Sequence, residues 1–240
     1  MENNEKILQG HSDLEKGAYL GAIASIATAD REASPEEMEY IAKLCEAADL
    51  SPQQQASVLR AATELSSEEL TRCLDILKQS ELKFSLVTDL MAFAKSDENY
   101  SEGEQKNVGM IADYLGVNEQ QFSLLDQFAE KAKTLEVTPQ ETHQPDFLSS
   151  LGLKDKFKSA GINGGGFLKG LIGFAAPMIL GGLMSRNRAR RSSGLGGTPG
   201  GGLLGGGGLG SLIGMLSGGR RFGNTGGFLQ KILGRSFQKR

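Results

Sequence analysis

Two short acidic stretches contain the side chains of this sequence that are best suited to chemistry. They lie near Asp30 and near Asp97, and each offers several carboxylate or amide oxygens within a few residues. Calcium takes about six to eight oxygen ligands, so each stretch can supply part of a coordination shell that water completes. The candidate ligands for a divalent cation, calcium or magnesium, are Asp30, Glu32, Glu37, Asp97, Asn99 and Glu104.

The same stretches also fit a purely structural role. Ser34 stands three residues before Glu37, and Ser101 three residues before Glu104, which is the spacing of a helix N-terminal capping box. Neither stretch has the glycine and the terminal bidentate glutamate of an EF-hand loop. Both interpretations, helix caps and a divalent-cation site, therefore stay open.

Motifs of catalysis are missing from the sequence. It has no nucleophile elbow, no phosphate-binding loop, no zinc-ligand spacing and no dinucleotide fingerprint between a strand and a helix. Cys45 and Cys73 fall inside helical patterns, where a small buried hydrophobic residue is the usual role. We expect a protein without enzymatic activity and without catalytic residues. The sequence indicates no cofactor other than the possible divalent cation.

Repeated capping signals place the elements around these residues. A Ser or Asn precedes a Glu or Gln by three residues at Ser12/Glu15, Ser34/Glu37, Ser51/Gln54, Ser66/Glu69, Ser101/Glu104 and Asn118/Gln121. No segment of this region alternates with a period of two as a strand does. The pattern predicts an all-α fold of about seven helices, at 13–29, 35–49, 52–64, 67–79, 81–96, 102–115 and 119–133.

An offset of 67 residues superposes the first three helices on the last three. The aligned pairs are Leu20/Val87, Ile23/Leu90, Ile26/Phe93, Ala27/Ala94, Asp30/Asp97, Ser34/Ser101, Glu37/Glu104, Ile41/Val108, Leu44/Ile111 and Leu50/Val117. The apolar pairs keep helical spacing, so both copies present the same inward stripe. We interpret this as a tandem duplication of a three-helix unit with pseudo-two-fold symmetry, joined by the helix at 67–79.

The duplicated signature resembles the TerB-like family, named for a tellurite-resistance protein. It reads AIASIATADREASPEE in the first copy and DLMAFAKSDENYSEGE in the second. The resemblance implies a stress-associated, non-enzymatic module that works near the membrane with partner proteins, and ion binding through Asp30, Glu37, Asp97 and Glu104. The family usually has Gly after the first Asp, where this chain has Arg31 and Glu98.

Charge and glycine divide the chain near residue 150. Residues 1–150 carry 12 Lys and Arg against 28 Asp and Glu, a net charge of −16, whereas residues 151–240 carry 14 against 1, a net charge of +13. Most of the 33 glycines lie in the second part. We predict an N-terminal extension at 1–11, a TerB-like helical domain at 12–133, a linker at 134–160 and a low-complexity, glycine-rich basic and apolar tail at 161–240.

The tail combines apolar blocks with arginines. An uncharged block before the first arginine cluster is only about 22 Å long as a helix, against a hydrocarbon core of about 30 Å. Interfacial insertion with arginines on anionic headgroups fits better. Similar pieces, FLKGLIG, SLIGML and FLQKILG, recur. The residues expected to bind a membrane or partner are Phe167, Leu168, Lys169, Leu171, Ile172, Phe174, Arg186, Arg188, Arg190, Arg191, Arg220 and Arg221.

These features predict an adaptor that docks at the cytoplasmic face of the inner membrane through its tail and binds partner proteins. The N-terminus, MENNEKILQG, lacks the basic start and apolar core of a secretory signal, so a cytoplasmic, peripherally membrane-associated location is expected. The expected partners are a membrane surface or membrane protein, other proteins and further copies of the chain through the tail. Nucleic acid is not expected, because stacking aromatics are few. The alternative function is a divalent-cation sensor.

Overall fold

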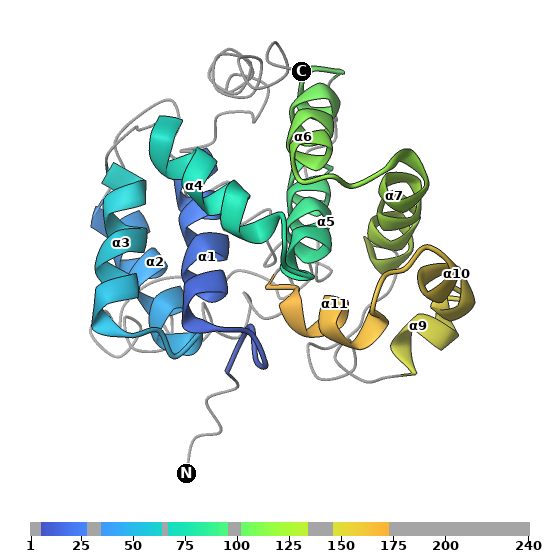
Figure 1. The fold of residues 1–240 in the computed structure, drawn as a ribbon, viewed down its shortest axis with the longest axis horizontal. Coiled ribbons are helices and arrows are strands. Elements are labelled where there is room, and N and C mark those ends of the chain that lie inside the picture. Colours follow the sequence, from blue (N-terminus) through green and yellow to red (C-terminus); the bar gives the residue numbers. More distant parts are fainter. Residues whose placement is uncertain (1–5, 28–34, 64–66, 96–101, 134–145, 173–240) are drawn as a thin grey trace, which may run out of the picture.

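The computed structural model describes residues 6–27, 35–63, 67–95, 102–133 and 146–172, and within these ranges the regular structure is entirely α-helical. The prediction of an all-α fold is confirmed. The helices are α1 (Asp13–Ala27), α2 (Pro35–Ala47), α3 (Pro52–Thr63), α4 (Ser67–Leu77), α5 (Leu82–Ala94), α6 (Glu102–Tyr114), α7 (Glu119–Lys133), α9 (Phe147–Ser150), α10 (Lys154–Ser159) and α11 (Gly164–Gly170) (Figure 1). Helices α1 to α7 begin within one residue of their predicted starts.

Helices α1 and α5 form the centre of the fold because they are apolar on nearly every face. In α1 the run from Ala18 to Ile26 is buried, and in α5 the run from Phe84 to Met91 is buried. A helix that is hydrophobic all round must be covered on all sides. Helices α2, α3 and α4 pack on α1, whereas α6, α7 and α11 pack on α5. Figure 1 shows these as two adjoining groups of helices.

Helices α2 and α6 end in the same way at positions that the 67-residue offset aligns. Asp49 and Gly116 both have a positive φ, of 55° and 74°. The amide of the next residue then bonds back to the helix, Leu50 to the Cys45 carbonyl at 3.1 Å and Val117 to the Ala112 carbonyl at 2.9 Å. This is the left-handed helix ending that glycine favours. The shared ending agrees with the duplication, whereas the pseudo-two-fold axis stays a prediction.

Two of the predicted capping boxes form completely. The Ser12 amide donates to the Glu15 carboxylate at 2.9 Å, and the Glu15 amide donates back to the Ser12 hydroxyl at 3.3 Å. Asn118 and Gln121 make the same reciprocal pair at 3.1 and 2.9 Å. Each box satisfies two amides that a helix start leaves without an intrahelical partner.

The box at Ser51 forms by half. The Gln54 amide donates to the Ser51 hydroxyl at 3.4 Å, but the Ser51 amide donates to the Asp13 carboxylate of α1 at 3.1 Å rather than to Gln54. A capping partner from another helix thus ties the start of α3 to the start of α1. The predicted boxes at Ser34, Ser66 and Ser101 lie outside the described residues.

The packed structure extends further along the chain than the sequence indicated. Residues 134–160 were predicted as a linker and residues from 161 as a tail, but residues 146–172 form α9, α10 and α11, and α11 packs on α5. The physical reason is that this segment buries a regular set of apolar side chains: Phe147, Leu148, Leu151, Leu153, Phe157, Ile162, Phe167, Leu168, Leu171 and Ile172. We call residues 146–172 the closing segment, and residues 173–240 the distal tail.

Candidate functional site

The side chains of the six proposed cation ligands are not among those that the structure describes. Asp30, Glu32, Asp97 and Asn99 lie outside the described residues, and of Glu37 and Glu104 the helical backbone alone is described. Within the described ranges, no group of three or more His, Cys, Asp or Glu side chains could hold a metal ion. The cation site therefore stays a prediction.

A partly buried lysine stands at the end of α5, immediately before the second acidic stretch. The Lys95 ammonium pairs with two carboxylates of α7, Asp126 at 2.7 Å and Glu130 at 2.6 Å. Desolvation lowers the pKa of Lys95, but the hydrogen bonds to both carboxylates outweigh it and raise the pKa overall. This charge is thus fixed in its ionised form where α5 meets α7.

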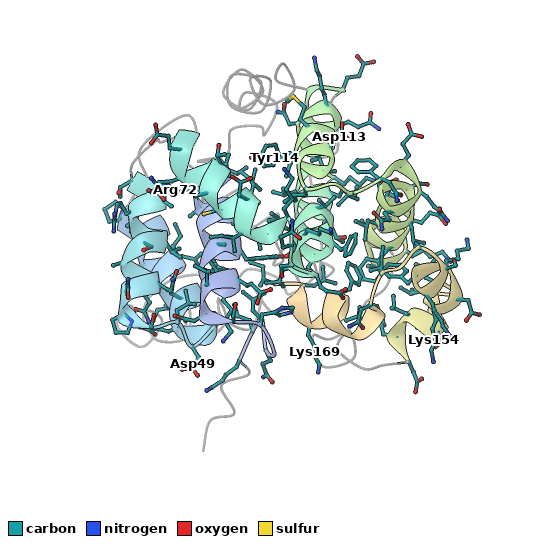
Figure 2. The ribbon with its side chains drawn as sticks, viewed as in Figure 1. Asp49, Arg72, Asp113, Tyr114, Lys154 and Lys169 are labelled. Atoms are coloured by element: carbon teal, nitrogen blue, oxygen red, sulfur yellow. The ribbon has the colours of Figure 1, made fainter. Side chains whose placement is uncertain are left out.

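The proposed membrane-binding residues divide into three groups. Phe167, Leu168, Leu171 and Ile172 are each no more than 1% exposed, so the structure places them in the core rather than on a membrane-facing surface. Lys169 is exposed on α11, and Figure 2 shows it at the edge of the ribbon. The others, Phe174, Arg186, Arg188, Arg190, Arg191, Arg220 and Arg221, lie outside the described residues.

Three phenylalanines hold the closing segment on α7. Each of its helices contributes one ring, Phe147, Phe157 or Phe167, and all three approach the ring of Phe128 edge-on, with centroids 6.2, 6.1 and 4.9 Å away. Edge-to-face pairs add roughly 0.5–1.5 kcal/mol beyond the burial of their area. The prediction of a linker overlooked this cluster, although the even spacing of the rings was a visible signal.

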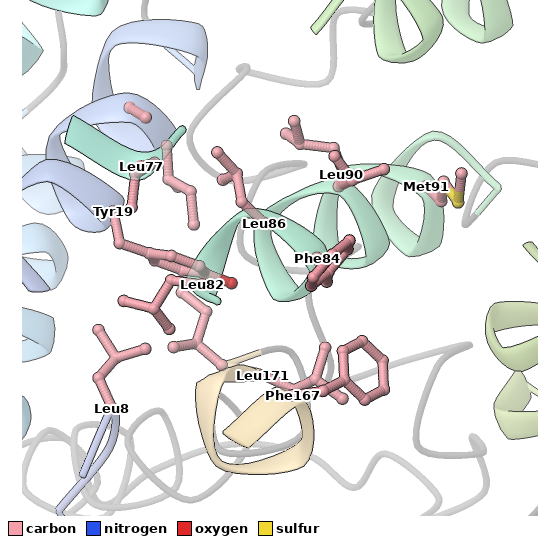
Figure 3. Packing of buried hydrophobic residues seen from close by; sticks show 14 of the residues in the cluster. Leu8, Tyr19, Leu77, Leu82, Phe84, Leu86, Leu90, Met91, Phe167 and Leu171 are labelled. Carbon is pink, nitrogen blue, oxygen red and sulfur yellow. The ribbon is translucent and has the colours of Figure 1, made fainter. Parts of the chain in front are cut away.

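Helix α11 lies in a close-fitting seat on α5. The Ser85 hydroxyl donates to the Phe167 carbonyl at 2.8 Å. At Gly170 an added Cβ would stand 2.7 Å from the Leu82 Cδ2 and 2.9 Å from the Ser85 Cβ, and closer still to the Ser85 hydroxyl. Figure 3 shows Phe167 of α11, and Leu171 directly after this helix, beside Leu82 and Phe84 of α5. A glycine is required at this approach.

A carboxylate in the core joins three parts of the chain. Asp89 of α5 is 2% exposed, accepts a hydrogen bond from the Tyr19 hydroxyl of α1, and accepts another at 3.0 Å from the Ile172 amide. Burial holds the pKa of Tyr19 well above its ordinary value, with Asp89 adding to the effect. Buried carboxylates require such partners because a desolvated charge is costly. Asp89 therefore fixes the end of the closing segment between the two central helices.

A polar hollow of about 450 Å³ opens where the N-terminal loop, the α4–α5 turn and the start of α11 meet. The residues around it are Gln9, Gly10, His11, Glu15, Gln79, Ser80, Glu81, Asn163, Gly166 and Lys169. Glu15 accepts hydrogen bonds from Ser12 and Ser80, which lower its pKa. Sequence reasoning did not find this hollow, because its lining comes from segments far apart in the chain.

His11 is the titratable ring of this hollow. Partial burial lowers its pKa, and although the carboxylates of Glu15 and Glu81 act in the opposite direction, the pKa stays below its ordinary value. An imidazole held neutral beside carboxylates can accept a proton as the pH falls. We find around it neither a nucleophile nor a set of metal ligands among the described residues.

The two cysteines behave as core residues. Cys45 and Cys73 are both buried free thiols, and burial raises the pKa of each to about 12. The thiolate is the reactive form of cysteine, so neither side chain is poised as a nucleophile. The Cys73 sulfur also packs tightly on α1, because a Cβ added at Gly21 would lie 3.0 Å from it.

Across the ranges that the structure describes, every helix is too short or too polar to cross a lipid bilayer. No curated protein and no solved structure matches the chain. A family model described as "Tellurite resistance protein TerB" matches residues 16–127, which run from α1 into α7. This match identifies residues 16–127 as a TerB-like domain.

Proposed function

We propose that this chain is a non-enzymatic, stress-associated adaptor of the tellurite-resistance type, which docks at the cytoplasmic face of the inner membrane through its distal tail and binds partner proteins. The observation that carries the proposal is that one chain contains both an acidic TerB domain and a basic tail of opposite charge. Residues 173–240 contain ten Lys and Arg and neither Asp nor Glu. The acidic domain and the basic tail suit different partners.

Two favourable contributions to membrane docking, from charge and from apolar burial, add together. Each basic residue near an anionic bilayer contributes about 1 kcal/mol, and buried apolar side chains add to that attraction. The distal tail interleaves Arg186, Arg188, Arg190 and Arg191 with apolar blocks on both sides. Because Phe167, Leu168, Leu171 and Ile172 are in the core, the docking part of the chain begins after Ile172 in this proposal.

Membrane fractionation of the full-length protein and of a truncation after Ile172 tests this function. A cut at residue 150 would remove α10 and α11 from the core, so a cut after Ile172 separates loss of the tail from loss of the fold. We expect full-length protein in the membrane fraction and the truncation in the soluble fraction, with equal thermal stability. Full-length protein that is already soluble and monomeric would refute the membrane role.

Partner binding is tested in the same preparations. The adaptor role predicts that chemical crosslinking captures the same proteins with the truncation as with the full-length chain, because the TerB domain is present in both. Capture that depends entirely on residues 173–240 would argue that the partners are recognised by the tail instead.

A divalent-cation sensor is the second candidate function. It is favoured by the position of the two acidic stretches, which connect α1 to α2 and α5 to α6 at aligned places of the duplication. We expect calcium or magnesium to raise the melting temperature of the wild type but not of an Asp30→Asn, Asp97→Asn double variant. If millimolar calcium or magnesium does not raise the melting temperature of the wild type, the cation site is refuted and helix capping remains as the role of these residues.

A further inference from the structure

We infer that residues 224–234 of the distal tail are a second copy of the α11 sequence, and that this copy contacts an anionic lipid surface. The close contact with α5 accepts the first copy alone, so the apolar side chains of the second copy need another surface. The inference rests on the proposed membrane function and assigns it to one short segment. It follows from a repeat in the sequence, from the contacts of α11 and from one residue that differs between the copies.

The repeat aligns NGGGFLKGLIG at 163–173 with NTGGFLQKILG at 224–234. The identical pairs are Asn163/Asn224, Gly165/Gly226, Gly166/Gly227, Phe167/Phe228, Leu168/Leu229 and Gly173/Gly234. Two further apolar positions exchange one branched residue for the other, Leu171/Ile232 and Ile172/Leu233.

The shared residues have defined roles in the first copy. The Asn163 side chain caps α11 by accepting a hydrogen bond from the Gly166 amide at 3.3 Å. Phe167 and Leu168, together with Leu171 and Ile172 after the helix, are buried against the domain. The second copy thus retains a helix-capping residue and a matching set of four large apolar side chains.

One position separates the copies. Gly170 is replaced by Lys231, and at Gly170 any Cβ would overlap Ser85 and Leu82 of α5. The Ser85 Cβ, at 2.9 Å from that point, is attached directly to the backbone of α5 and cannot swing away. A segment with lysine at this position therefore does not fit against α5 in the way that α11 does.

A lipid surface fits what the second copy carries. Phe228, Leu229, Ile232 and Leu233 need an apolar environment, and Lys231 and Arg235 lie within or beside them. Apolar side chains combined with cations at the headgroups are the features of interfacial binding. A nucleic acid would satisfy the cations but not the four aliphatic and aromatic side chains.

The test is co-sedimentation of the full-length protein with vesicles that contain phosphatidylglycerol, compared with vesicles of phosphatidylcholine alone. The variant is Phe228→Ser with Leu229→Ser, and the matched control is Phe222→Ser, which removes a tail phenylalanine outside the repeat. We expect the double variant to bind the anionic vesicles about tenfold more weakly or worse, and the control to stay within about twofold of the wild type.

The possible results separate this inference from the proposed function. A double variant that binds like the wild type, while the truncation after Ile172 does not bind, overturns the inference and leaves membrane docking intact. Full-length protein that binds neither kind of vesicle overturns both. A double variant with a lowered melting temperature, or a tail that binds RNA and not vesicles, overturns the assignment of the repeat to lipid.

Discussion

Replacing Gly170 with alanine should destabilise the protein, although alanine is normally the better helix residue. The added Cβ would stand 2.7 Å from the Leu82 Cδ2 and 2.9 Å from the Ser85 Cβ. Forcing an extra carbon into a packed core costs about 1–3 kcal/mol. Displacing Ser85 also weakens its hydrogen bond to the Phe167 carbonyl, which contributes about 1 kcal/mol. Up to about 1 kcal/mol of helix propensity acts in the opposite direction.

The expected result is a net loss of about 1–3 kcal/mol in the free energy of unfolding, measured by urea denaturation of the full-length protein. At about 2–4 °C per kcal/mol, the melting temperature should fall by several degrees. Gly109→Ala in α6 is the matched control, because a Cβ there meets nothing within 4 Å. It should stabilise the protein by about 0.4–1 kcal/mol. If both variants gained stability equally, the close seat of α11 on α5 would be refuted.

Three further predictions concern buried and titrating groups. Tyr19→Phe removes a hydrogen-bond donor from the buried Asp89 and should cost about 1–3 kcal/mol in a denaturant titration, whereas an unchanged midpoint would contradict the contact. Because burial lowers the pKa of His11 below its usual 6.5, the unfolded chain binds more protons near that pH; stability should decline as the pH falls below about 6.5, and His11→Gln should reduce that decline. Cys45 and Cys73, with pKa values of about 12, should react with iodoacetamide at pH 8 only in denaturant, and rapid labelling of the native protein would show that the thiols are accessible.

The helical part of the fold could be predicted because its signals are local. A capping residue and the start of its helix lie within a few positions of each other, as Ser12 and Glu15 do, and an apolar stripe needs only helical periodicity. The starts of α1 to α7 followed from such signals. The cap of α3 was half right because the second partner of Ser51 is Asp13, which no local pattern reveals.

The closing segment was missed because composition outweighed its pattern. The change in glycine content and charge suggested a linker, yet Gly152 and Gly161, with φ values of 66° and 72°, directly follow the C-cap residues of α9 and α10. After each of these glycines a buried apolar residue follows, Leu153 or Ile162, whose amide bonds back to the helix at 2.9 Å. Glycine in these places stops short helices and does not indicate disorder.

The candidate site depends on contacts that sequence spacing does not encode. Tyr19, Asp89 and Ile172 come from α1, α5 and the end of the closing segment, and the polar hollow likewise combines three distant segments. An apolar run rich in glycine looks the same in sequence whether it meets lipid or protein. Phe167, Leu168, Leu171 and Ile172 pack against protein in the structure. Gly170 has no Cβ, so the backbone approaches α5 closely enough to bury all four side chains. The same reasoning makes the residue at this position, glycine or lysine, the feature that separates the packed copy from the copy proposed to meet the membrane.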